Sequence, residues 1–410
     1  AVPATSQGIT TVVVGQDGGS HWPLADFFQR LAQEPVSITV ASYSGHGTLR
    51  DRVMGKDFRR HASADEVKAM VALLEQDMEA GALGLATGME YDPGIYSDPS
   101  EVVALAKAAA GYGGRYISHM RSEDRWFDEA VEEIINIGQQ TGMPVQISHF
   151  KLAMKRLWGH APRVLERLDQ ARADGVDITA DIYPYEYWHS NLMVLLPERD
   201  PTDREAVEEA LAEIAPPEGL WFTNFPPQPE YVGMKLTEVA ELRGKDPVTT
   251  FMEVATESIA WEERTGEGDS IIGTSMLEAD IRQLLLWPHT NLCTDGGLTS
   301  LHPRARGSYP RVLGRYVREE GLLSLEDAIF KATGLAATHM GFTDRGTLVP
   351  GAVADLVLFD PDTIIDNATP QEPERLSTGV LTVWVNGEQV FADGQPTGKR
   401  PGRAILRTAN

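Results

Sequence analysis

Two short apolar runs near the middle of the chain end in the same two residues, a serine followed by a histidine. The first run is 116–119 and the second is 145–149, so the histidines are His119 and His149. Each run is short and β-prone, which predicts a buried strand with an imidazole at its carboxyl end. Imidazole nitrogens are common ligands of Zn²⁺, so two of them at neighbouring strand ends predict a metal site. The simpler alternative is that both histidines only cap core strands.

Two carboxylates follow other predicted strands. Asp17 comes after the run 8–15, and Asp295 follows 291–294 within the sequence TDGG. With His119 and His149 they form a set of ligands typical of a hydrolytic zinc site. A carboxylate beside a metal-bound water can take its proton and pass it to a leaving amine, and Asp295 is the candidate for this role. The alternative for each carboxylate is that it caps the turn in which it lies.

The elements that must position these residues alternate along the chain. The segment 126–140 between the two histidine runs has an apolar face, which predicts a helix. Strand, helix and strand in succession predict a parallel crossover, which brings the carboxyl ends of both strands to one edge. We therefore expect an α/β fold with its catalytic residues at that edge. The predicted parallel strands are 8–15, 36–42, 84–87, 116–119, 145–149, 176–181 and 291–294.

These strands are one fewer than a (β/α)8 TIM-like barrel needs, and the missing first strand is expected before Ala1. The barrel is assigned to 1–345, with an acidic, proline-containing insertion at about 197–268 that covers the rim. The remainder, 346–410, is β-rich and is expected to be the C-terminal part of a small accessory β-sandwich. Asn386-Gly387 predicts a hairpin turn there.

Helices are predicted between the strands, in the insertion and before the tail. The segment 45–50 is expected to be a loop, and 271–273 a short strand outside the barrel. The predicted helices are 23–31, 64–80, 99–110, 126–140, 162–173, 203–214, 236–243, 277–286, 310–320 and 324–333.

Composition limits the partners of the protein. The net charge is -24 over 410 residues, which argues against nucleic acid or an anionic membrane as a partner. No apolar run has the length of a membrane-spanning helix. Cys293 is the single cysteine, so no disulfide forms within the chain. A cytoplasmic location is expected, although a periplasmic or secreted protein stays open because the chain does not begin with methionine, and an oligomer also stays open.

Several motifs occur in an order that is more specific than any of them alone. They are YISHMR at 116–121, QISHFK at 146–151, DIYPY at 181–185, TDGG at 294–297 and HPR at 302–304. This set resembles the D-aminoacylase (N-acyl-D-amino-acid deacylase) branch of the amidohydrolase superfamily. The resemblance covers nearly the whole chain.

The resemblance implies a metal-dependent barrel that hydrolyses the amide of a small N-acyl-D-amino acid. By position, His119 and His149 are ligands of one or two Zn²⁺ ions, and Asp295 is the general acid/base that can touch a second ion. The resemblance further implies that the substrate carboxylate is held by Lys151, Tyr183 and Arg304, with a contribution from Ser190. An ammonium and a guanidinium around one carboxylate give charge-assisted recognition.

The chain departs from the family pattern in two ways. None of its ten histidines forms the His-x-His pair of the first barrel strand. Asp17 stands where this branch has a cysteine ligand, and a carboxylate is a harder ligand than a thiolate.

Three other readings stay open or are disfavoured. A dipeptidase, or another amidase for carboxylate-bearing substrates, would need the same carboxylate clamp. A metal-poor, non-catalytic member of the family would explain both departures. A cyclic-amide hydrolase of the hydantoinase type is disfavoured, because 84–90 lacks the lysine that such enzymes carboxylate.

Overall fold

A parallel sheet organises the fold in the computed structural model, which describes residues 1–407. Strand β1 (Thr11–Val14) pairs with β2 (Thr39–Ser42), and β3 (Ser44–Gly45) follows β2 after one residue. A six-stranded sheet follows in the order β3, β4, β5, β6, β7 and β11, all parallel. These later strands are β4 (Gly84–Gly88), β5 (Arg115–His119), β6 (Val145–Ile147), β7 (Ile178–Ile182) and β11 (Thr290–Leu292). The predicted α/β class and its parallel sheet are confirmed, and each of the seven predicted strands forms.

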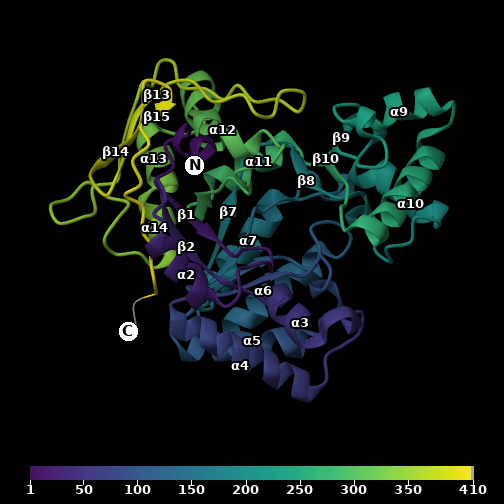
Figure 1. Cartoon of the computed structure of the whole chain (residues 1–410), viewed down its shortest axis with the longest axis horizontal. Helices are drawn as coiled ribbons and strands as arrows, with labels where there is room; N and C mark the ends of the chain where they lie inside the picture. Colours follow the sequence, from purple (N-terminus) through teal and green to yellow (C-terminus); the bar gives the residue numbers. More distant parts are fainter. Residues whose placement is uncertain (408–410) are drawn as a thin grey trace.

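Helices connect the parallel strands, and their apolar faces build the largest core cluster (Figure 1). The best-specified of them is α4 (Ala64–Ala80), which has the predicted bounds. It begins with a capping box between Ser63 and Glu66 and ends at Gly81, whose φ of 108° a residue with a Cβ rarely adopts. The other helices that precede a parallel strand are α2 (Leu24–Gln33), α5 (Pro99–Gly111), α6 (Phe127–Thr141), α7 (Ala161–Ala173) and α11 (Glu278–Leu286). Helices α13 (Leu325–Ala332) and α14 (Gly334–Met340) follow β11.

Two predictions of local structure were wrong. The expected loop at 45–50 is the start of helix α3 (His46–Met54). The sequence of this helix has no clear apolar periodicity, so the helix was not predicted. It is stabilised instead by buried polar contacts: Glu101 accepts a hydrogen bond from Arg50 Nη1 at 2.5 Å and lies 2.8 Å from His46 Nε2. The helix expected at 310–320 begins earlier, as α12 (Arg304–Arg311), and continues as a π-helix over Val312–Glu319.

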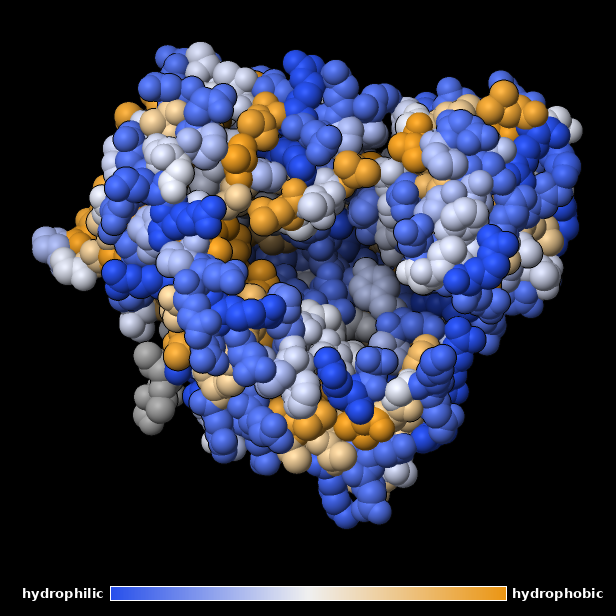
Figure 2. Space-filling view, in the orientation of Figure 1, coloured by the Kyte–Doolittle hydropathy of each residue, from blue (hydrophilic) through white to orange (hydrophobic). Residues whose placement is uncertain are grey.

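A second, antiparallel sheet lies between β7 and β11 in the chain. Strands β8 (Tyr187–Ser190), β9 (Leu220–Asn224) and β10 (Ser270–Thr274) pair in the order β8, β10, β9, so the short strand predicted at 271–273 belongs here. Helices α8 (Arg204–Glu209), α9 (Leu236–Arg243) and α10 (Pro247–Thr265) accompany it. Figure 1 shows this part, with α9 and α10, as a lobe beside the parallel sheet. Figure 2 shows the same face hollowed between this lobe and the rest of the molecule.

The C-terminal strands form a four-stranded antiparallel sheet of β12 (Leu356–Phe359), β13 (Val380–Val385), β14 (Glu388–Ala392) and β15 (Gln395–Pro396). Asn386 and Gly387 join β13 to β14 with φ values of 50° and 79°, which confirms the predicted hairpin turn. The short helix α1 (Val2–Thr5) contributes Ala4 to the small core beneath this sheet. Within 1–407, no helix is long and apolar enough to cross a membrane.

Candidate metal centre and substrate pocket

The structure brings together three of the four predicted metal ligands. His119 is the last residue of β5, while His149 and Asp17 follow β6 and β1 by two or three residues. Nδ1 of His119 lies 3.0 Å from Nε2 of His149, and Nε2 of His149 lies 3.1 Å from Oδ1 of Asp17. One donor atom of each residue lies within 4.8 Å of the others. Two nitrogens and one oxygen, from residues at or just after the ends of three parallel strands, therefore lie close together.

The backbone at these strand ends is held in an unusual conformation. Asp17, His149 and Asp295 have φ values of 53°, 35° and 46°, in the left-handed region that residues with a Cβ seldom occupy. At His149 the backbone N–H donates to Oδ1 of Asp181 at 2.6 Å, which holds the turn in place. Such strained residues cluster at functional sites when the surrounding structure holds them.

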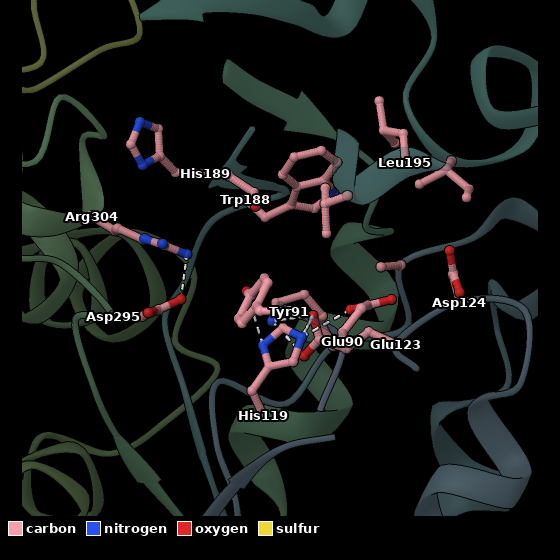
Figure 3. A pocket seen from close by; sticks show the side chains of 15 residues that line it. Glu90, Tyr91, His119, Glu123, Asp124, Trp188, His189, Leu195, Asp295 and Arg304 are labelled. Carbon is pink, nitrogen blue, oxygen red and sulfur yellow. Dashed lines mark hydrogen bonds and ion pairs between the residues drawn. The ribbon is translucent and has the colours of Figure 1, made fainter. Parts of the chain in front are cut away.

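Two carboxylates that the sequence analysis did not single out complete the surroundings of the histidines. Glu90 follows β4 by two residues and its Oε2 lies 2.8 Å from Nε2 of His119. Glu123 follows His119 by four residues and its Oε1 lies 3.1 Å from Nδ1 of His149. Figure 3 shows Glu90 and Glu123 beside the His119 ring. Both occupy loops without a recognisable pattern, and their only sequence signal is a position just after a predicted strand.

The charges around these residues favour a cation between them. Burial would raise the pKa of Asp17, but His149, His119 and Lys151 lower it to about 2. Burial and Lys151 oppose protonation of His149, yet Asp17, Asp295 and Glu123 raise its pKa well above the usual value. A buried point that stabilises positive charge and is lined by N, N and O donors suits a divalent metal ion such as zinc.

Asp295 lies in the same cavity but outside the three-donor group. Its Oδ2 is 2.5 Å from Nη1 of Arg304, so two residues predicted for separate roles form an ion pair (Figure 3). A carboxylate and a guanidinium at this distance attract each other, so Arg304 holds Asp295 beside the donor group.

The predicted substrate-binding residues surround one end of the cavity. Lys151, Ser190 and Arg304 line it, while Tyr183 lies beneath both cations. The guanidinium of Arg304 is 4.5 Å from the centroid of the Tyr183 ring, and Nζ of Lys151 is 5.5 Å from it. The Tyr183 hydroxyl is buried and has no hydrogen-bond partner within residues 1–407. Lys151 itself pairs with both oxygens of Glu123, at 2.7 and 2.8 Å.

The antiparallel sheet supplies a further wall of the cavity. Trp188, His189 and Ser190 of β8 line it, and Figure 3 shows Trp188 above the His119 group. Val194, Leu195 and Ile214 add apolar surface from the following segment. The cavity has a volume of about 40 Å³ for water-sized molecules, and it is confined rather than flat.

Known proteins resemble this chain over almost its full length. Residues 233–391 match the family model described as "Amidohydrolase family". The chain is 36% identical to N-acyl-D-glutamate deacylase of Alcaligenes xylosoxydans xylosoxydans, over 99% of this chain and 82% of the relative. It is 34% identical to D-aminoacylase of the same organism, over 99% and 83%.

Solved structures agree with these relatives. The N-acyl-D-glutamate deacylase of Bordetella bronchiseptica, complexed with zinc and a phosphonate that mimics the tetrahedral intermediate, matches with a TM-score of 0.85. It shares 36% identity over 99% of this chain and 84% of its own. The fold is that of an amidohydrolase. Within that superfamily, the chain belongs to the D-aminoacylase branch, and the resemblance predicted from its motifs is confirmed.

Proposed function

We propose that this protein hydrolyses the amide bond of N-acyl-D-amino acids and releases a carboxylate and a D-amino acid. The observation that carries the proposal is the combination, in one cavity, of a three-donor metal centre with two cations that can hold a substrate carboxylate. The relatives at 34–36% identity are deacylases of such compounds by name.

Asp17, His119 and His149 would hold a zinc ion, and Asp295, which lines the same cavity, would contact a second one. A zinc ion bound there would supply a Lewis acid for the acyl carbonyl and would acidify a bound water. Zinc is the metal in the solved N-acyl-D-glutamate deacylase.

Residues of the chain itself would transfer the proton and bind the substrate carboxylate. Asp295 accepts the proton of the attacking water and delivers it to the departing amide nitrogen. Arg304 and Lys151 bind the substrate carboxylate while Asp295 and Glu123 hold them in place. Ser190, which lines the cavity, and the buried Tyr183 hydroxyl would add hydrogen bonds to that group.

We also propose that the parallel sheet is the wall of a (β/α)8 barrel. On this proposal the segment 197–268 covers the rim, and 346–410 belongs to a small accessory β-sandwich. The parallel strands β1 to β7 and β11, which follow one another in chain order, and the placement of β8 against the cavity support this arrangement.

The test is hydrolysis of N-acetyl-D-methionine and N-acetyl-L-methionine by the zinc-loaded protein, with a dipeptide as a third substrate. We expect the D compound to be cleaved, the activity to disappear with a chelator, and zinc to restore it. His149→Asn should abolish cleavage, whereas His160→Asn, at an exposed histidine before α7, should not. Cleavage of the dipeptide alone would identify a dipeptidase, and zinc-loaded protein that cleaves none of the three would contradict the proposal.

A further inference from the structure

Building on the proposed metal centre, we propose that Glu90 and Glu123 are positioning residues that fix the tautomers of the two histidine ligands. Each carboxylate contacts one imidazole on the nitrogen that faces away from the three-donor point. Together they would present Nδ1 of His119 and Nε2 of His149, free of protons, to the metal ion.

The contact at His119 fixes which nitrogen carries the proton. A carboxylate oxygen only accepts hydrogen bonds, so the nitrogen 2.8 Å from Glu90 Oε2 must donate. That nitrogen is Nε2, and the neutral ring then keeps its lone pair on Nδ1. Nδ1 is also the atom that lies 3.0 Å from His149 Nε2. Glu90 thus selects the tautomer in which His119 can bind a metal at the shared point.

The second histidine repeats the arrangement with its nitrogens exchanged. Oε1 of Glu123 lies 3.1 Å from Nδ1 of His149, and Nζ of Lys151 lies 2.6 Å from the same nitrogen. On the proposal, Nδ1 donates its proton to Glu123, Lys151 donates to that carboxylate rather than to the ring, and Nε2 is the metal-binding nitrogen. Nε2 is the atom that faces both Asp17 Oδ1 and His119 Nδ1. A histidine ligand whose other ring N–H donates to a carboxylate is a recurrent way to orient the ring and raise its basicity.

Glu123 also connects the metal centre to the substrate clamp. Nζ of Lys151 lies 2.7 and 2.8 Å from its two oxygens and 2.6 Å from Nδ1 of His149. Two donors so close together repel each other unless an anion lies against both, and the buried Glu123 carboxylate fills that role. Glu123 therefore holds His149 for the metal and Lys151 for the substrate at a fixed separation.

Glu90 and Glu123 could instead be ligands of an ion of their own, because they form a second donor group with His119. Such an ion would need the lone pair of His119 Nε2, which the 2.8 Å contact with Glu90 assigns to a donated proton. Glu123 Oε2 is 3.9 Å from that nitrogen, a longer separation than the contacts at the other group. The two interpretations differ in the number of bound ions, which can be measured.

The direct test is the protonation of both rings in the zinc-loaded protein, read from histidine ¹⁵N chemical shifts and assigned with His119→Asn and His149→Asn. We expect a proton on Nε2 of His119 and on Nδ1 of His149. This measurement needs no change at either glutamate, so the folding of a variant does not affect it. The opposite tautomer at either ring would overturn the proposal.

Zinc affinity and stoichiometry of variants give the second test, by competition with a chromophoric chelator. Glu90→Ala and Glu123→Ala should each weaken zinc binding by about 10- to 100-fold, the loss typical when such a partner is removed. Glu90→Gln and Glu123→Gln keep an accepting oxygen, so their zinc affinity should fall less than that of the alanine variants. Glu123→Ala should also raise the KM for the substrate, because Glu123 contacts Lys151. Glu90→Ala should mainly weaken zinc binding.

Glu101 provides a matched control away from the cavity. It is buried and lies 2.8 Å from Nε2 of His46, the same kind of contact without a metal centre nearby. Glu101→Gln should lower the free energy of unfolding but leave zinc affinity within about twofold of the parent.

The failures of the two proposals can be told apart. A parent protein that binds zinc but does not cleave N-acetyl-D-amino acids contradicts the proposed function alone, because affinity is measured without substrate. Alanine variants that keep the parent's zinc affinity, or that lose one whole ion from the stoichiometry, overturn the positioning role. A parent that binds no zinc overturns both.

Discussion

Nδ1 of His119 and Nε2 of His149 face each other at 3.0 Å, across the ends of two neighbouring parallel strands. If both rings are neutral and donate their other N–H to glutamate, these nitrogens carry lone pairs that repel. A shared cation removes the repulsion, and Asp17 adds a negative charge on the same side. The pair therefore has a geometry that a metal ion stabilises.

Asp17 should contribute directly to zinc affinity. Asp17→Ala removes one of three donors, and we expect the zinc Kd to rise at least about tenfold. Asp17→Cys substitutes a softer thiolate ligand and should bind zinc at least as tightly as the parent. Chelator competition measures both, with Asp26→Ala, at an exposed carboxylate on α2, as the control. Unchanged affinity in Asp17→Ala would show that Asp17 only caps its turn.

Tyr183 should affect substrate binding more than stability. Its hydroxyl has no partner within residues 1–407, so Tyr183→Phe loses no hydrogen bond of the free protein. We expect a KM several times higher with an unchanged free energy of unfolding. The control is Tyr185→Phe, because that hydroxyl donates to Asp366 at 3.0 Å. This variant should lose about 1 kcal/mol of stability and keep its KM. The reverse pattern would remove Tyr183 from the substrate site.

The cavity should prefer a substrate with an apolar side chain. Trp188, Leu195 and Ile214 line its far wall, and Glu90 adds a negative charge. The two cations that line it, Lys151 and Arg304, are assigned to the substrate carboxylate. An acidic side chain would be buried without a positive partner, which is costly. We expect kcat/KM for N-acetyl-D-leucine to exceed that for N-acetyl-D-glutamate by at least about tenfold.

A variant checks the origin of this preference. Leu195→Arg places a cation at the far wall and should raise the relative rate on N-acetyl-D-glutamate, whereas Leu195→Met should not. A parent that prefers the glutamate derivative would show that another basic residue reaches the side chain.

His189 should make stability depend on pH. Burial, and secondarily the positive charge of Arg304, lower its pKa from 6.5 to about 4. The unfolded chain therefore binds a proton between pH 6.5 and 4 that the folded protein does not, so stability is complete above pH 6.5 and falls as the pH drops toward 4. The loss attributable to His189 is at most about 3 kcal/mol. Denaturant unfolding of the parent and of His189→Gln at pH 7 and 4.5 measures it. Equal pH dependence in both proteins would exclude this contribution.

Site residues could be predicted from the sequence where they lie at the end of a recognisable apolar strand. His119, His149, Asp17 and Asp295 each follow an apolar strand, and parallel pairing alone brings such residues to one edge. The Asn386-Gly387 turn and the capped helix α4 carry local signals of the same kind. Ser190, to which the resemblance gave a contact with the substrate carboxylate, also lies in the cavity.

Other features depend on contacts between distant segments. Helix α3 was missed because Arg50 and His46 are satisfied by Glu101, about fifty residues further along the chain. Glu90 and Glu123 lie in loops, where neither periodicity nor turn chemistry marks a residue as functional. The ion pair between Asp295 and Arg304 joins two residues that the motifs assign to different roles. One wall of the cavity comes from β8. This strand pairs with β10, which lies after the inserted segment in the sequence.

The measurement that tests the central claim most directly is anomalous diffraction at the zinc edge from crystals of the zinc-loaded protein. The account predicts a peak at bonding distance from Nδ1 of His119, Nε2 of His149 and a carboxylate oxygen of Asp17, within about 2.0–2.2 Å of each. Absence of a peak among these three residues, or a peak bonded to Glu90 and Glu123 instead, would contradict it.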